Sequence, residues 1–76
     1  MNEIYTLIDA ECQRQLAIWG EQSHAPGDWM LIIVEELGEA ARASLEGEGA
    51  DVKEELIQAA AVIVSWLGSG DLDDNR

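Results

Sequence analysis

The chain has 76 residues, of which sixteen are Asp or Glu and only four are Lys or Arg, so its formal net charge is −12. This charge argues against binding to nucleic-acid polymers or anionic membranes, because both interactions depend on basic side chains. The apolar share of 47%, the single cysteine, and the lack of a signal peptide or a long uncharged apolar run predict a soluble cytoplasmic protein of one domain.

The first predicted element is a helix from about residue 3 to residue 19. Its apolar positions recur every three or four residues, which is the period of one helix face. They are Ile4, Leu7, Ile8, Cys12 and Trp19, with Gln15 in the same series. Cys12 is expected to pack within this face. Residues 20–27 contain the only proline and have the composition of a loop.

A second helix is predicted from about residue 28 to residue 46. Asp28 suits its N-cap, because a carboxylate can accept from the open backbone N–H groups of the first turn. Gly38 lies inside this helix, where a glycine costs about 1 kcal/mol relative to alanine. Its presence indicates either the close approach of another helix or a ligand, or simple drift.

A third helix is predicted from about residue 51 to residue 67, with Gly68 and Gly70 ending it. Asp51 and Glu54 resemble a capping box at its start. Residues 59–67, A-A-A-V-I-V-S-W-L, are apolar around almost the whole circumference, which is typical of a helix buried on several sides. Three short helices cannot enclose one of their own number, so we expect a second chain to cover part of this segment.

The fold class that follows is all-α, with about three short antiparallel helices in residues 1–70 and a polar, flexible tail in residues 71–76. A chain of this size buries only about 60–65% of its unfolded surface, which makes its core marginal. Small domains compensate with disulfides, metals or oligomers, and a disulfide within the chain is excluded. We therefore expect an oligomeric helical bundle, a bound metal, or both.

Two pairs of polar residues interrupt the apolar pattern of the second and third helices. Glu36 and Glu39 are three residues apart, as are Glu55 and Gln58, so each pair shares a helix face. The short connection makes the two helices antiparallel neighbours, which would gather three carboxylates and one amide around a small volume. Such an oxygen-only set suits Mg²⁺ or Mn²⁺. The alternative is a solvated acidic face.

These residues also carry a resemblance to a known family. E-E-L-G-E at 35–39 followed by E-E-L-I-Q-A-A-A-V at 54–62 resembles the MazG-like all-α nucleoside triphosphate pyrophosphohydrolases, whose signature is E-x-x-E, a spacer, then E-x-x-D. Glu36, Glu39 and Glu55 match this signature, and Gln58 stands in place of the aspartate. Upstream, R-Q-L-A-I-W-G-E-Q-S-H at 14–24 is similar to small, often phage-associated members, so the likeness covers about residues 11–67.

The resemblance implies a MazG-like domain that hydrolyses a nucleoside triphosphate to its monophosphate and pyrophosphate. Glu36, Glu39 and Glu55 would then be the catalytic and metal-binding residues, Gln58 a further metal ligand, and Mg²⁺ the cofactor, with Mn²⁺ as a substitute. It also implies a homodimer or homotetramer and a role in controlling or cleaning the nucleotide pool. Some phage-type relatives favour guanine, which makes guanine nucleotides the first to test.

Further candidates for the site lie around this motif. The candidates for binding substrate are two tryptophans and a histidine that border the first loop and two basic residues for phosphate: Trp19, His24, Trp29, Arg14 and Lys53. Either tryptophan can instead be a core anchor, His24 can simply be exposed, and Lys53 can be solvated. Glu35 and Glu54 adjoin metal ligands but point about 100° away on their helices, so at best they orient a ligand or a water without binding the metal themselves.

Gln58 keeps a second function class open. Because its amide is neutral, the chain can also be a non-catalytic helical module that keeps the fold and binds a nucleotide or a protein.

Overall fold

The computed structural model describes residues 2–47 and 49–71, and in this part of the chain every regular element is a helix. The helices are α1 (Asn2–Trp19), α2 (Pro26–Leu45) and α3 (Gly49–Ser69), so the predicted all-α fold class and the number of helices are confirmed. None of these helices combines the length and apolar character that crossing a bilayer requires.

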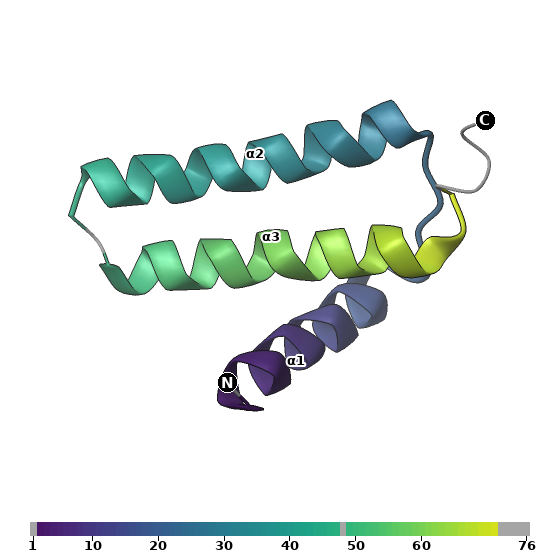
Figure 1. The fold of residues 1–76 in the computed structure, drawn as a ribbon, viewed down its shortest axis with the longest axis horizontal. Coiled ribbons are helices and arrows are strands. Elements are labelled where there is room, and N and C mark those ends of the chain that lie inside the picture. Colours follow the sequence, from purple (N-terminus) through teal and green to yellow (C-terminus); the bar gives the residue numbers. More distant parts are fainter. Residues whose placement is uncertain (1, 48, 72–76) are drawn as a thin grey trace.

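α3 is the central element of the arrangement. It runs antiparallel to α2, and α1 crosses it on the other side (Figure 1). The backbones of α1 and α2 each approach α3, whereas within the described residues they do not approach each other. Short loops explain the α2–α3 hairpin, since a connection of a few residues forces consecutive helices to lie antiparallel.

The core lies between α2 and α3. Trp29 and Ile33 from α2 pack with Val62 from α3, and Ile32 and Trp66 cover them in part. The indole rings of Trp29 and Trp66 are stacked, with centroids 6.2 Å apart and planes 7° from parallel. The alanines Ala59 and Ala61 are also buried, and their small side chains allow neighbouring helices to approach α3 closely.

α2 begins two residues earlier than the sequence predicts. Its N-cap is Ala25, which makes no side-chain cap bond, and Pro26 occupies the first turn. Proline is favoured there because its fixed φ suits a helix and its missing N–H costs nothing. The prediction of Asp28 as N-cap is therefore wrong: its backbone N–H already donates to the Ala25 carbonyl at 2.9 Å. The Asp28 carboxylate still lies at the positive end of the helix dipole.

The ends of α3 also differ from the prediction. The helix begins at Gly49, so Asp51 lies inside its first turn and is not a cap, and it continues through Gly68 to Ser69. Gly70 ends it with a φ of +86°, a conformation that glycine adopts without steric cost. Gly38 within α2 is not needed for packing inside the chain, since a Cβ built there would meet no described atom within 4 Å.

The predicted flexible tail is wrong at its first residue. Asp71 is buried, and its carboxylate accepts hydrogen bonds from the loop between α1 and α2. The remaining residues of that predicted tail, 72–76, lie outside the described residues.

The chain leaves much of α3 open, as the sequence predicts. Ala59, Ala61 and Val62 are buried, whereas Ile63, Val64 and Leu67 are exposed, Leu67 to 65%. α2 and α1 therefore cover two sides of α3 and leave an apolar side of it exposed.

Candidate metal centre and adjoining groove

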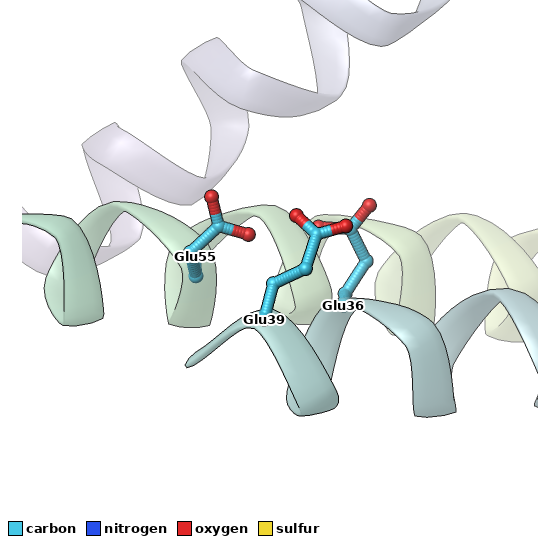
Figure 2. A group of neighbouring side chains, drawn as sticks. All are labelled: Glu36, Glu39 and Glu55. Carbon is cyan, nitrogen blue, oxygen red and sulfur yellow. The ribbon is translucent and has the colours of Figure 1, made fainter. Parts of the chain in front are cut away.

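Three carboxylates meet between α2 and α3. Glu36 and Glu39 lie one turn apart on α2, and Glu55 faces them from α3 (Figure 2). One oxygen from each lies within 4.8 Å of the others, so a single ion could contact all three. The sequence prediction that these residues come together is thus realised by the hairpin, which brings positions 16–19 residues apart in the chain side by side.

Two of these carboxylates hold an oxygen that lacks a partner. Glu36 Oε2 and Glu55 Oε2 are buried without a hydrogen bond from any described residue. A buried carboxylate oxygen in this state is costly, because it has lost water and gained nothing in return. A cation between the helices would satisfy both oxygens.

Burial and repulsion between the carboxylates also raise pKa values in the cluster. Burial, followed by the neighbouring carboxyl group of Glu39, raises the pKa of Glu55 to about 7. Burial and the Glu39 charge also raise the pKa of Glu36. Both shifts favour the neutral acid over the carboxylate. Without a cation, the cluster therefore holds protons at a pH where an ordinary glutamate has none.

A cation from α1 lies close to this cluster. Arg14 forms a two-pronged ion pair with Glu11, with Nε–Oε1 at 2.8 Å and Nη2–Oε2 at 2.7 Å. The guanidinium holds the pKa of Glu11 below its usual range, and its charge offsets a small part of the rise in the pKa of Glu36. Gln15 Nε2 donates to Glu11 Oε2 at 2.9 Å and to the Gln58 backbone carbonyl at 3.4 Å, which attaches this group to α3.

A groove of about 580 Å³ begins at Glu36 and runs toward the α1–α2 loop. All three helices and the loop line it, through Arg14, Gln15, Trp19, Glu21, Gln22, Ser23, His24, Ile32, Glu36, Gln58 and Val62. Its volume lies within the range of small-molecule sites, and it combines apolar walls with a few polar groups. The same groove is thus lined by one of the three carboxylates, Glu36, and by an aromatic residue, Trp19.

Four of the sequence-predicted site residues outside the acidic trio line this groove: Arg14, Trp19, His24 and Gln58. Trp19 is 59% exposed, which leaves its ring free for stacking. The His24 ring nitrogen Nε2 hydrogen-bonds the Gln22 carboxamide oxygen at 2.9 Å.

Trp29 does not fit the predicted contact with a nucleobase. Trp29 is 1% exposed, its ring stacks on that of Trp66, and it makes a T-shaped contact with the His24 ring at a centroid distance of 4.9 Å. Its indole N–H donates to Asp71 at 2.7 Å. Trp29 is therefore a core residue, the alternative that the sequence left open.

Lys53, Glu35 and Glu54 stand apart from the groove. Lys53 borders a separate apolar hollow between the start of α1 and the start of α3, so the predicted phosphate contact does not fit its position. Glu35 and Glu54 are exposed and act on the acidic trio only through their charge, which raises the pKa of Glu36 and Glu55 respectively.

Two groups of groove residues are not among the candidates that the sequence predicts. Gln15 lies within an apolar series of α1, where a glutamine is a signal of a buried polar partner; it is 7% exposed and donates to Glu11. Gln22 and Ser23 also line the groove, and their only sequence signal is their place between Trp19 and His24.

No family model, curated protein or solved structure matches this chain.

Proposed function

We propose that this protein is a Mg²⁺-dependent nucleotide pyrophosphohydrolase of the MazG-like type, which cleaves a nucleoside or deoxynucleoside triphosphate to the monophosphate and pyrophosphate and thereby controls or cleans the nucleotide pool. The observation that carries the proposal is the trio of Glu36, Glu39 and Glu55, whose ligand oxygens lie within 4.8 Å of one another beside a groove of about 580 Å³. The resemblance of the E-x-x-E and E-x-x-Q motifs to the MazG-like signature implies the substrate class.

The donor set fits Mg²⁺, and Mn²⁺ as its substitute. All the ligand atoms are oxygens, the ligands that hard divalent ions prefer, and two buried oxygens lack any other partner among the described residues. When bound, Mg²⁺ would supply positive charge for phosphate oxygens and lower the pKa of bound water. In this proposal Gln58 contributes a carboxamide oxygen from one turn beyond Glu55.

In the reaction, a water oxygen forms a bond to the α-phosphorus while the bond from that phosphorus to the α–β bridging oxygen breaks. Pyrophosphate leaves, and the water gives up its proton to the solvent. Arg14 lines the groove with Glu36 and presents a guanidinium for phosphate oxygens. The exposed ring of Trp19 can stack on the base, and the polar groups of Gln22 and His24 face the same groove. Guanine nucleotides are the first to test.

The test is pyrophosphate release from a panel of nucleoside triphosphates with Mg²⁺. Glu36→Gln should nearly abolish release, because it removes a charged ligand that faces both the trio and the groove. Glu35→Gln is the matched control, since it makes the same change at the neighbouring exposed position. No release from any nucleotide, or equal loss in both variants, would rule the proposal out.

Gln58 favours a second candidate, a non-catalytic helical module that binds nucleotide or a protein. A neutral amide leaves three carboxylates in the cluster, and the MazG-like signature has four acidic positions. This candidate predicts that the groove binds a nucleotide with no release of pyrophosphate. Calorimetric titration with a non-hydrolysable triphosphate, run beside the release assay, separates the two functions.

We also propose that the chain forms a homodimer or homotetramer in the cytoplasm, and the uncovered apolar surface supports this assembly. Exposed apolar residues directly follow residues that face the partner helix: Val34 follows Ile33 on α2, and Ile63 and Leu67 follow Val62 and Trp66 on α3. Each successive residue is rotated by about 100° around the helix axis. In an antiparallel pair, this rotation places Val34 of α2 on the same side of the hairpin as Ile63 and Leu67 of α3, and these residues form two apolar stripes, one on each helix.

The acidic site faces the other way. Gln58 precedes the buried Ala59 and Glu39 precedes the buried Ala40, which turns both toward the side opposite the apolar stripes. α1 reaches α3 on that side through Gln15, which donates to the Gln58 carbonyl. A second copy packed on the stripes would therefore bury apolar surface and leave the groove open to nucleotide.

A further inference from the structure

Asp71 lies just beyond the end of α3, yet it is only 9% exposed. Three donors surround its carboxylate: the Trp29 indole N–H at 2.7 Å, the His24 backbone N–H at 2.8 Å, and the Ser23 hydroxyl at 3.0 Å. Its own N–H donates to the Ser69 hydroxyl at 3.0 Å, and that hydroxyl donates to the Trp66 carbonyl at 2.7 Å. One carboxylate thus joins the end of α3 to the α1–α2 loop and the start of α2.

The chemistry of this contact favours a permanent charge. The indole N–H of Trp29, followed by the backbone N–H of His24, holds the pKa of Asp71 below its usual range. The carboxylate is therefore ionised at neutral pH, and hydrogen bonds to an ionised acceptor are stronger than those between neutral groups.

The segment that Asp71 holds forms the wall of the proposed nucleotide groove. Ser23 and His24 line the groove that reaches Glu36, and Gln22 joins them through its hydrogen bond to the His24 ring. Glu21, Gln22 and Ser23 also line a second cavity of about 510 Å³, which Ser65 and Ser69 border on the α3 side. The loop thus contributes to two cavities, and its position affects the width of both.

We infer that Asp71 is a positioning residue for nucleotide binding, because it fixes the loop that carries Gln22, Ser23 and His24 before the nucleotide arrives. The inference rests on the proposed function. A loop that is already ordered spares the nucleotide the entropic cost of ordering it, so the contribution of Asp71 falls on binding. The carboxylate trio stands on α2 and α3, away from the loop, so the chemical step and cation binding should not depend on Asp71.

The central test is Asp71→Asn, which keeps the size of the side chain and removes its charge. KM should rise roughly tenfold, the effect of losing about one charge-assisted hydrogen bond, while kcat and the Mn²⁺ affinity stay within about twofold. Amide hydrogen exchange should accelerate in residues 20–25 and remain unchanged in the middle of α2 and α3. Asp51→Asn is the matched control, because it makes the same change at an exposed position at the other end of α3.

Ser69→Ala provides a milder variant in case Asp71→Asn does not fold. It removes the hydroxyl that accepts from the Asp71 backbone N–H, leaves the three bonds to the carboxylate, and lies outside the lining of the proposed nucleotide groove. KM should rise in the same direction by a smaller factor, again with kcat preserved.

The outcomes separate the inference from the proposed function. Two outcomes with an active wild type would overturn the positioning role alone. In the first, both variants keep the wild-type KM; in the second, their kcat falls and protection from exchange is lost throughout the chain. A wild type that neither hydrolyses triphosphates nor binds an analogue with a methylene in place of the α–β oxygen overturns the proposed function and, with it, the role in nucleotide binding. Local exchange in residues 20–25 then still decides whether Asp71 holds the loop.

Discussion

One carboxylate oxygen of Glu39 on α2 and one of Glu55 on α3 lie within 4.8 Å of each other across the helix interface. Two carboxylates at this range repel, and the repulsion falls when one of them carries a proton. The pKa of Glu55, raised to about 7 by burial and by this neighbour, shows which state the chain favours. Near neutral pH, a proton on Glu55 would therefore compete with a cation for the same carboxylate.

The first prediction concerns stability against pH in the presence of chelator. Between pH about 4.5 and 7, folded Glu55 binds more protons than unfolded Glu55, so this residue makes the free energy of unfolding fall as pH rises through that window. Glu36 acts in the same direction. The melting temperature should therefore be lower at pH 8 than at pH 5.5, and Glu55→Gln should reduce that difference.

The pKa values of Asp71 and Glu11 are shifted downward, so these two residues oppose the rise in stability toward low pH. Their pKa values are lowered, so the stability that they contribute is lost only as pH falls below about 4. A melting temperature in chelator that does not change between pH 5.5 and 8, or a difference that survives in Glu55→Gln, would contradict the prediction.

The second prediction concerns the cation. At pH 8, Mn²⁺ at about 100 times its dissociation constant should raise the melting temperature by roughly 10–20 °C, through binding to the folded state alone. The rise should be smaller at pH 5.5, because the ligands must lose their protons to bind. Differential scanning fluorimetry with and without chelator measures both quantities.

Glu39→Gln sharpens this test. It removes one repelling charge, so it should raise the melting temperature in chelator while reducing the response to Mn²⁺. Glu35→Gln, one turn earlier and exposed, should change neither quantity by a comparable amount. Equal melting temperatures with chelator and with excess Mn²⁺ would contradict the prediction that the trio binds a cation.

The third prediction concerns Gln58. With three formal charges in the cluster, Mn²⁺ should bind weakly to the free chain and much more tightly when nucleotide phosphates add ligands, a coupling that is reciprocal. Gln58→Asp should strengthen binding to the free chain, and Gln58→Ala should weaken it roughly tenfold, the range seen for losing one ligand-supporting group. Gln13→Ala, on the exposed side of α1, is the control. Calorimetric titrations that give one affinity with and without a non-hydrolysable nucleotide would count against this role.

The fourth prediction concerns assembly. Leu67→Asp and Val34→Asp place a charge on the two apolar stripes, which are exposed in the single chain, so they should dissociate an oligomer while the helical circular dichroism persists. Val62→Asp should instead unfold the chain, because Val62 belongs to the core. Light scattering that finds a folded wild-type monomer at micromolar concentration would rule out the proposed assembly.

The sequence allowed the helices and the acidic trio to be predicted because both depend on local spacing. A separation of three residues places Glu36 beside Glu39 on any helix, and one short loop brings Glu55 to them. The helix starts were harder, since Asp28 and Pro26 both suit a first turn and only the observed backbone decides between them.

The role of Asp71 could not be predicted from spacing. Its partners, Ser23, His24 and Trp29, lie 42–48 residues away in the chain, and an aspartate after two glycines has the local character of a solvated tail. Trp29 was ambiguous for a related reason: an aromatic residue at a helix start serves equally well in a core or a binding site until its neighbours are known.

Within the described residues, α1 packs against α3 and not against α2, so the candidate site is built from two separate parts. The hairpin of α2 and α3 carries Glu36, Glu39 and Glu55, whereas α1 contributes Arg14 and Trp19 to the groove. If the chain has the function that we propose, substitutions along α1 would alter which nucleotide fits without moving a carboxylate. Under that proposal, evolution could change the substrate through one helix and keep the ion chemistry on the other two.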